Sequence, residues 1–233
     1  MQDIGFDILG DLKLLPEDNF NWENKASSLY CIVTGNISSD LRTTLQTLAH
    51  LGTCYQGVFF VPGTLEYETA SDIQSRTEEL MNLTLPIPNV CILQNHIVMI
   101  DGIAIIGANG WANADTDNLT VENLMEAASR EEDTTYLYRS IVKLQKHLDI
   151  TKVIVVTNAV PHPDLYFKET PDVVEVQIPL YNTLQADTEH KVTHWVFGTY
   201  DKMVDTYVDN INYVSNPRPR KQPYWAKRIT LSV

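Results

Sequence analysis

The chain has 233 residues, 44% of them hydrophobic and 20% charged, which is enough for one large domain, residues 1–233, with its own core. Its net charge of -13 argues against nucleic acid as the main partner, because phosphate binding needs a basic face. No apolar run approaches the roughly 18 residues of a membrane span. The acidic start MQDIGFDILGD lacks the basic residues of a signal peptide, so we expect a cytoplasmic protein with no membrane association.

Short runs rich in β-branched residues predict strands along the whole chain, and several are apolar throughout, as in strands covered on both faces. The runs are LYCIVTG (29–35), GVFFVPG (57–63), NVCILQN (89–95), HIVMID (96–101), GIAIIGANGW (102–111), KVIVVTN (152–158), HWVFGTY (194–200), TYVDNINYVSNP (206–217) and ITLSV (229–233). After residue 190 the strands follow one another with few helical signals, which predicts a meander.

Helical patterns separate the earlier strands. Residues 38–52 place leucines on one face, with Ser38 or Ser39 as the expected N-cap. Residues 71–83 open with a serine and a glutamine at capping-box spacing. The longest helical stretch, 120–148, contains the acid run 131–133, which we expect to divide it and to form a solvated face. The predicted fold class is therefore α/β, a two-sheet β-sandwich flanked by helices.

Polar residues gather just after the candidate strands, where open α/β sheets place their ligand crevice. We call this set the strand-end residues. They are Asp11, Lys13, Asn36, Thr64, Leu65, Glu66, Asn158, Thr199 and Asp201.

The order and spacing of these blocks resemble the calcineurin-like metallophosphoesterase family along nearly the whole chain. Members typically show Asp-x-His, Gly-Asp, Gly-Asn-His-Glu, Thr-His-His-x-Pro and Gly-His-x-His at successive strand ends. The corresponding blocks here are DLKL, GNI, PGTLEYE, TNAVP and GTYD. The stretches NVCILQNHIVMIDGIAIIGANGW and DTYVDNINYVSNPR resemble non-catalytic parts of the same family. The resemblance implies the sandwich fold and a strand-end site for two divalent metal ions.

The resemblance fails at the metal ligands. Such sites hold their ions with carboxylate oxygens and imidazole nitrogens. By the family pattern Asp11 and Glu66 are retained, Lys13 and Leu65 replace histidines, and Asn36 replaces the bridging carboxylate. Asn158, Thr199 and Asp201 stand at three further histidine positions. An ammonium has no lone pair to donate, so we expect no metal and no cofactor.

Two expectations follow for this pocket. Lys13 should pair with Asp11 or Asp201 as a buried charge and take over part of the metals' electrostatic role. Leu65 should pack into the space that the ions would fill. Among the six histidines, His162 and His194 are the candidates for the rim of a shifted metal site, although neither has a partner at ligand spacing. Cys31, Cys54 and Cys91 are expected to be buried free thiols.

The favoured hypothesis is a pseudoenzyme, an inactive metallophosphoesterase-like protein that acts as a protein-binding or scaffold module. The alternatives are a metal-dependent phosphoesterase with an atypical site using Asp11, Glu66, Asp201 and His162, and a metal-free sensor that holds a phosphorylated ligand through Lys13 and Asn158.

The segment NPRPRKQPYWAKR (216–228) is basic in an acidic chain. A solvated loop is one interpretation. The other is a docking patch for a protein partner, because arginine and aromatic residues are enriched at interfaces. The candidate interface residues are Arg218, Arg220, Lys221, Tyr224 and Trp225.

Overall fold

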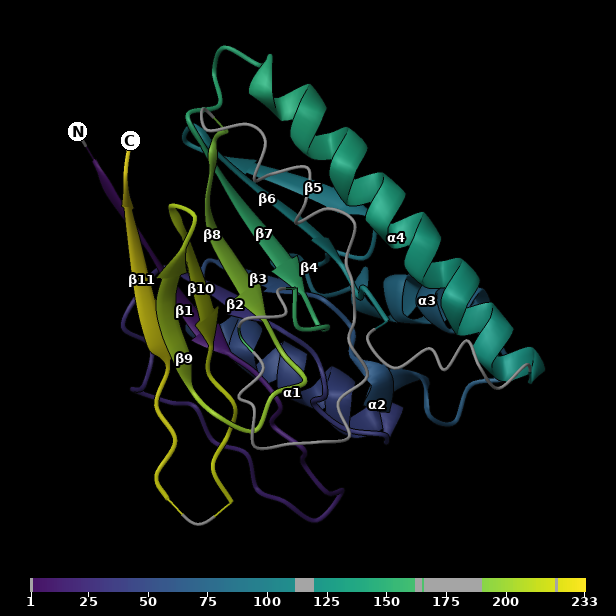
Figure 1. Cartoon of the computed structure of the whole chain (residues 1–233). Helices are drawn as coiled ribbons and strands as arrows, with labels where there is room; N and C mark the ends of the chain where they lie inside the picture. The colour runs from purple at the N-terminus through teal and green to yellow at the C-terminus, as the bar shows by residue number, and fades with distance from the viewer. Residues whose placement is uncertain (1, 112–119, 162–164, 166–189, 221) are drawn as a thin grey trace.

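The computed structural model describes residues 2–111, 120–161, 165, 190–220 and 222–233, without side chains at 121–124 (Figure 1). The strands are β1 (Asp3–Leu9), β2 (Tyr30–Val33), β3 (Gly57–Phe60), β4 (Val90–Ile92), β5 (His96–Ile100), β6 (Ile103–Ala108), β7 (Lys152–Thr157), β8 (Val192–Phe197), β9 (Val204–Val208), β10 (Ile211–Ser215) and β11 (Lys227–Ser232). The helices are α1 (Leu41–Cys54), α2 (Thr64–Tyr67), α3 (Ile73–Thr84) and α4 (Val121–Gln145).

The strands form two sheets. The first has the order β11-β1-β2-β3-β4, with β1 to β4 parallel and β11 antiparallel to β1. The second has the order β5-β6-β7-β8-β10-β9, with a parallel centre and antiparallel strands at both edges. Each of the nine predicted runs overlaps a strand, although the run 206–217 contributes to two, β9 and β10, and β1 was not among the predicted runs. The chain is thus a mixed α/β fold with two multi-strand sheets flanked by helices.

Side-chain alternation explains why the central strands are apolar on both faces. In β3, Phe59 packs between the two sheets, whereas Phe60 packs toward α1. In β6, Ile105 faces the inter-sheet core and Ile106 faces the core under α4. Successive strand residues point to opposite sides of a sheet, so a strand with helices on one side and a sheet on the other buries every residue.

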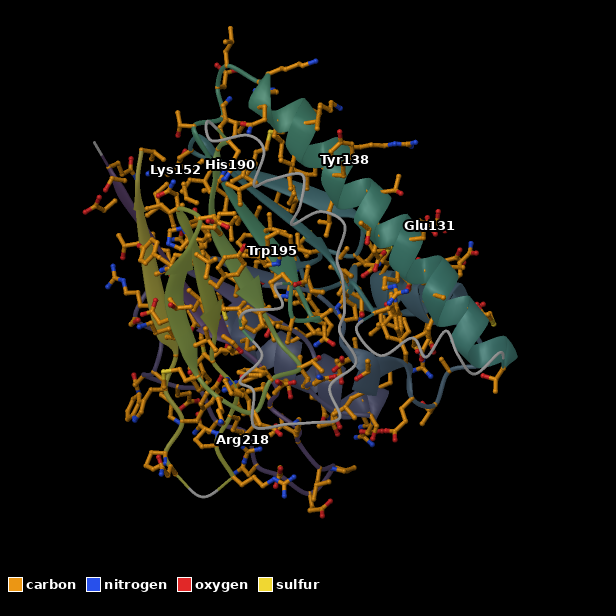
Figure 2. All side chains as sticks on the ribbon, viewed as in Figure 1. Glu131, Tyr138, Lys152, His190, Trp195 and Arg218 are labelled. Carbon is orange, nitrogen blue, oxygen red and sulfur yellow. The ribbon has the colours of Figure 1, made fainter. Side chains whose placement is uncertain are left out.

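The helices cover the two outer faces of this sandwich. Figure 1 shows α4 crossing the face of β5, β6 and β7, while α1, α2 and α3 lie on the side of the first sheet. Leu137, Ile141 and Leu144 of α4 pack on the second sheet, and Leu48 and Leu51 of α1 pack on the first. In Figure 2, Trp195 lies inside the fold, whereas Glu131 and Tyr138 lie on α4. Both of these α4 residues are exposed.

The expected helix caps are wrong by one or two residues. Asp40 caps α1 by accepting from the backbone N–H of Thr43 at 2.8 Å. Asp72 caps α3 by accepting from the N–H of Ser75 at 2.7 Å. Aspartate competes with serine for this position, because either side-chain oxygen can accept from the free N–H groups of the first turn.

The expectation that residues 131–133 divide the long helix is also wrong, because α4 is continuous. Glu131 and Glu132 are exposed, but Asp133 is buried. Its carboxylate accepts from Gly110 N at 2.9 Å and from Gln94 Nε2 at 2.7 Å. One acid of the run therefore fastens α4 to the loop after β6, rather than facing solvent.

The predicted meander after residue 190 is only partly correct. Strands β9 and β10 form an antiparallel hairpin, but β8 pairs with β10 in parallel. Strand β11 then crosses to the other sheet and pairs with β1. The two chain ends run side by side (Figure 1), with Gln2 and Val233 exchanging backbone hydrogen bonds of 2.9 and 3.0 Å. In the described part of the chain, no helix has the length and apolar character needed to cross a membrane.

We expect Asp133→Ala to lower the free energy of unfolding by about 1–3 kcal/mol, because it strands the buried N–H groups of Gly110 and Gln94. Glu131→Ala is the matched control, an exposed acid in the same run, and should change stability by no more than about 0.5 kcal/mol. Urea denaturation measures both. Equal effects would contradict the anchoring role.

Urea denaturation of the wild-type protein and of Asp133→Ala at two pH values gives a second test of this anchor. Burial raises the pKa of Asp133 to about 6, above its ordinary value of 3.8, although bonds from Gly110, Asn95 and Gln94 lower it. A raised carboxyl pKa contributes stability at low pH that is lost as the pH rises through the folded-state value. The stability difference between the wild-type protein and Asp133→Ala should therefore be smaller at pH 8 than at pH 5.

Candidate functional site

The carboxyl ends of strands from both sheets converge at one end of the sandwich. Asp11 follows β1, Asn36 follows β2 and α2 follows β3 in the first sheet. Asn158 follows β7 and Thr199 follows β8 in the second. These side chains meet because parallel strands in both sheets deliver their ends to the same place.

A chain of hydrogen bonds joins four of these residues. Asn36 donates its Nδ2 hydrogens to Asp11 Oδ1 at 2.7 Å and to Thr199 Oγ1 at 3.3 Å. Thr199 in turn donates to Asn158 Oδ1 at 2.6 Å. Asn158 Nδ2 donates to the carbonyl of Thr34 at 2.7 Å, which returns the chain to the first sheet.

The orientation of the Asn36 amide is fixed by its surroundings. The backbone N–H of Leu65 can only donate, and it lies 3.0 Å from Asn36 Oδ1, with Thr64 Oγ1 at 3.3 Å from the same oxygen. The NH₂ group must then face Asp11 and Thr199, both of which can accept. Asn36 therefore presents hydrogens, not a lone pair, to the carboxylate at the centre of the site.

The backbone of the site is strained. Asp11, Lys13, Asn36 and Thr199 have φ values of 45°, 46°, 55° and 50°. This left-handed region is uncommon for residues other than glycine and is an outlier for a β-branched threonine. Such conformations persist where surrounding contacts hold them, and they cluster at functional sites. The hydrogen-bonded chain supplies those contacts here.

The loops also approach one another closely. A Cβ atom on Gly63 would lie 2.7 Å from Asn158 Nδ2, and one on Gly35, whose φ is 84°, would lie 2.8 Å from the same atom. Neither glycine could be replaced without displacing the Asn158 amide. The site is therefore closely packed around its polar groups.

Glu66 ties the loop after β3 to the loop after β2. Its buried carboxylate accepts four backbone N–H groups, from Gly63 at 2.6 Å, Asn36 at 3.0 Å, Ile37 at 2.6 Å and Ser38 at 3.3 Å. Burial raises the pKa of Glu66 to about 7, while these four N–H groups lower it. All four contacts are with the backbone, so the observed role of Glu66 is to shape the loops.

Asp11 is the buried carboxylate at the centre of the site. Its Oδ2 accepts from the backbone N–H of Tyr200 at 3.1 Å, in addition to the Asn36 bond on Oδ1. Burial raises its pKa, and the hydrogen bond from Asn36, the charge of Lys13 and the backbone N–H groups of Tyr200 and Thr199 lower it. The nearest side-chain donor to this carboxylate is thus an amide.

Lys13 pairs with Asp201, as one of the two expected partners, but the expectation that the pair is buried is wrong. Lys13 Nζ lies 3.1 Å from Asp201 Oδ1, but the two side chains are 46% and 91% exposed. Asp201 projects into solvent instead of joining Asp11. Because water solvates both charges, this ion pair contributes little to stability.

The expected packing of Leu65 is also wrong. Its side chain is half-buried and lines an open cavity, and only its backbone N–H reaches the hydrogen-bonded chain. Asn36 itself occupies the centre of the strand-end residues.

Of the two histidine candidates, His162 lies outside the described residues, and His194 does not join this cluster. His194 lies in β8, five positions before Thr199, and burial lowers its pKa to about 4. Within the described ranges, no three histidine, cysteine, aspartate or glutamate side chains come together in a group that could hold a metal ion. The three cysteines are free thiols, as predicted, but only Cys31 is buried, whereas Cys54 and Cys91 are partly exposed.

The basic segment is more structural than the sequence suggested. Tyr224 is buried, so the prediction that it is an anchor at the surface is wrong. Its hydroxyl accepts from Gly10 N at 3.0 Å and donates to the Asn216 carbonyl at 2.7 Å. Arg218, at one end of the molecule in Figure 2, donates to the Leu12 carbonyl at 3.0 Å. Arg220 is exposed, Trp225 is 61% exposed, and Lys221 lies outside the described residues.

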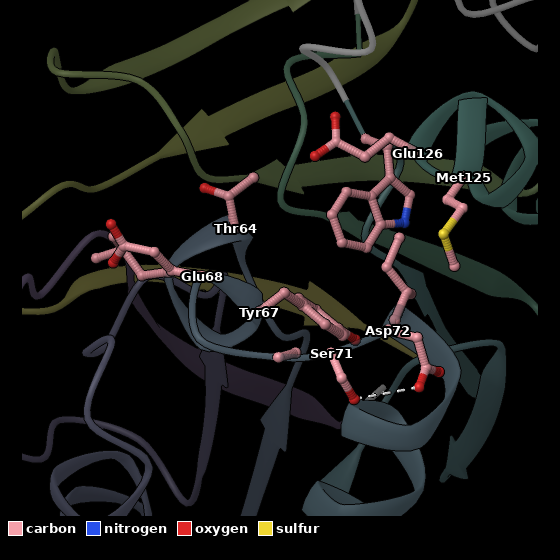
Figure 3. Close-up of a pocket in the computed structure, with 11 residues that line it drawn as sticks. Thr64, Tyr67, Glu68, Ser71, Asp72, Met125 and Glu126 are labelled. Carbon is pink, nitrogen blue, oxygen red and sulfur yellow. Dashed lines mark hydrogen bonds between the residues drawn. The ribbon is translucent and has the colours of Figure 1, made fainter. Parts of the chain in front are cut away.

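Sequence reasoning missed a cavity beside the site. It has a volume of about 640 Å³ and lies between α2, the start of α3 and the first part of α4 (Figure 3). Tyr67 and Trp111 meet edge to face there, with ring centroids 4.9 Å apart. The sequence signals were Tyr67, shortly after the predicted run 57–63, and Trp111, at the end of the run 102–111, and such positions do not by themselves indicate a contact.

Comparisons with known proteins identify the fold but not the family. No protein-family model matches the chain, and no curated protein matches it by sequence. Among solved structures, the phosphopantetheinyl hydrolase of Mycobacterium tuberculosis is similar, with a TM-score of 0.64 and 18% identity over 97% of this chain and 96% of that one.

Two further structures share the fold at lower identity. A Staphylococcus aureus protein described as a candidate 5'-nucleotidase has a TM-score of 0.55 and 11% identity, and the match covers 99% of this chain and 51% of that one. GAP50, described as the anchor in the inner membrane complex of Plasmodium, has a TM-score of 0.58 and 14% identity over 92% of this chain and 71% of that one. The neighbours thus include structures of the phosphoesterase type.

We expect Glu66→Gln to lower the free energy of unfolding by about 1–3 kcal/mol at pH 8, because the new amide group would direct hydrogens at backbone N–H groups. Glu68→Gln, an exposed change of the same kind two residues away, should be neutral within about 0.5 kcal/mol. Chemical denaturation compares the two variants. A neutral Glu66→Gln would show that the four N–H contacts contribute little.

We expect Lys13→Ala to change the free energy of unfolding by less than about 1 kcal/mol, since its ion pair with Asp201 is solvated. Asp201→Ala should have an equally small effect. A loss of several kcal/mol in thermal or urea unfolding, confined to Lys13→Ala, would instead show that the lysine neutralises Asp11 inside the site.

Proposed function

We propose that this chain is a degenerate, calcineurin-like member of the metallophosphoesterases whose metal site has been replaced by a hydrogen-bonded network, and that it acts as a protein-binding or scaffold module. The observation that carries the proposal is the amide of Asn36, which donates to both Asp11 and Thr199. A bridging metal ligand must offer lone pairs at this place.

The other strand-end side chains that could offer an oxygen to a metal ion already use it in hydrogen bonds within the chain. Asn158 uses its oxygen for Thr199 and its nitrogen for the Thr34 carbonyl. Glu66 uses both carboxylate oxygens for backbone N–H groups. These side chains do not fit a pair of divalent cations, because the two buried carboxylates among them, Asp11 and Glu66, cannot balance four positive charges. No step of a metal-dependent reaction is therefore assigned to this chain.

The same contacts weigh against the two alternatives. An atypical hydrolase built on Asp11, Glu66 and Asp201 would need these carboxylates together, but Asp201 is exposed and paired with Lys13. A phosphate sensor using Lys13 and Asn158 would need the Asn158 amide to turn toward a ligand, although it is buried and already paired. A protein-binding module requires neither rearrangement.

The metal content of the purified protein tests this proposal. We expect elemental analysis to find manganese, zinc and iron far below one equivalent, and millimolar manganese to leave the melting temperature unchanged. Hydrolysis of bis(p-nitrophenyl) phosphate should not exceed that of Asp11→Asn, which keeps the shape of Asp11 but removes its charge. Stoichiometric metal, together with turnover that is lost in Asp11→Asn, would overturn the proposal.

A further inference from the structure

Two cavities join into one groove between the α2–α3 segment and α4. The first, of about 640 Å³, is the cavity of Figure 3, and the second, of about 700 Å³, continues between α3 and α4. They share Asp72, Ile73, Trp111 and Met125 as lining residues. We call this continuous space the α3–α4 groove. Because its lining residues come from α2, α3 and α4, the groove suits an extended chain better than a single small molecule.

The α3–α4 groove is acidic along its whole length. Its acidic lining residues are Glu68, Asp72, Glu78, Glu126, Glu132 and Asp133. The described lining includes no lysine or arginine. Figure 3 shows Glu126, from α4, across the cavity from Tyr67. Acids on both walls favour a positively charged occupant.

Apolar side chains lie between these acids. Tyr67 and Trp111 form the aromatic part of the groove, and Leu65 and Ile73 lie beside them. Met125 of α4 and Met81 of α3 are 42% and 37% exposed. Methionine is flexible and polarizable, and it is common at surfaces that adapt to peptides. The two methionine side chains can change rotamer and so make room for a side chain of a ligand.

The groove also contains two buried polar atoms without partners. Trp111 is 3% exposed, and its Nε1–H has no acceptor in the described structure. Asn95 Oδ1, in the second cavity, has no donor there. Unpaired buried polar groups are costly and rare in native proteins. One unpaired donor and one unpaired acceptor match the carbonyl and N–H groups that a peptide backbone offers together.

We infer that the α3–α4 groove binds an extended segment of a partner protein in which lysine or arginine alternates with large apolar residues. The basic side chains pair with exposed acids of the groove, such as Glu78 of α3 and Glu132 of α4, and the apolar ones displace Met81 and Met125. A backbone carbonyl of the segment accepts from Trp111 Nε1, and a backbone N–H donates to Asn95 Oδ1. This inference rests on the proposed protein-binding function and names the chemistry of the partner.

An acetylated nine-residue peptide of alternating lysine and leucine is the probe, and calorimetric titration measures its binding. We expect it to bind at least tenfold more tightly than the same peptide with glutamate in place of lysine. Equal affinities for the two peptides would overturn the inference, since the acids of the groove would then have no role.

Matched charge variants separate the groove from the general attraction of an acidic protein for a cation. Glu78→Lys combined with Glu132→Lys changes two exposed groove acids, and we expect affinity to fall at least tenfold. Glu17→Lys combined with Glu23→Lys makes the same change of net charge at exposed positions outside the groove, and affinity should fall less than threefold. Equal losses in both variants would refute the assignment.

The indole N–H of Trp111 provides a direct readout in the full chain. In ¹H–¹⁵N spectra, assigned with Trp111→Phe, its signal should move downfield as the peptide carbonyl becomes its acceptor, while that of exposed Trp225 stays in place. An unmoved Trp111 signal at saturation would overturn the proposed contact. Lysine amide that binds as tightly as the peptide and displaces it would reassign the groove to a small cation.

The outcome for the groove is separable from that for the proposed function. Peptide binding that fails in a protein without metal or turnover sinks only the groove assignment. Turnover with bound metal sinks the pseudoenzyme proposal, whatever the peptide does.

Discussion

The amide of Asn36 joins more of the strand-end loops than any other side chain of the site. It donates to Asp11 and Thr199 and accepts from Thr64 and Leu65. Its backbone N–H reaches Glu66, and its carbonyl accepts from Lys13 N at 2.9 Å. Three loops of the first sheet and one of the second are thereby joined at one residue. Buried polar networks of this kind rigidify a fold when every member is satisfied.

This network also accounts for the strained backbone around it. Left-handed conformations at Asp11, Asn36 and Thr199 each carry a local cost, which the surrounding bonds offset. The glycines at 35 and 63 allow the loops to meet at distances that a side chain would prevent. The loops thus keep the left-handed backbone conformations that are common at functional sites, while Asn36, Asn158 and Thr199 form hydrogen bonds with one another and with the backbone. Such an arrangement stabilises this end of the sandwich.

The α3–α4 groove differs from the strand-end residues in this respect. Asn36, Asn158 and Thr199 of the strand-end residues use their side-chain polar atoms within the chain, whereas Trp111 Nε1 and Asn95 Oδ1 are unpaired within the described structure. The buried Asp133 holds one wall of the groove, because it fastens α4 to the loop that carries Gly110 and, next to it, Trp111. The acid run that looked like a solvated face therefore has two roles, with one member anchoring the helix and its neighbour Glu132 lining the groove.

The strands and the polar residues at their ends follow from the order of the amino acids alone. Apolar β-branched runs favour burial on both faces, as in β3 and β6, and the polar residues after them lie at strand termini, so Asp11, Asn36, Asn158 and Thr199 could be grouped by inspection of the sequence. Packing between distant segments settled the rest, namely that β8 pairs with β10 in parallel, that Asp201 faces solvent, and that Tyr224 and Asp133 are buried. This division arises because periodicity reports which side of an element is covered, whereas strand partners and the burial of a single polar residue depend on contacts between segments far apart in the chain.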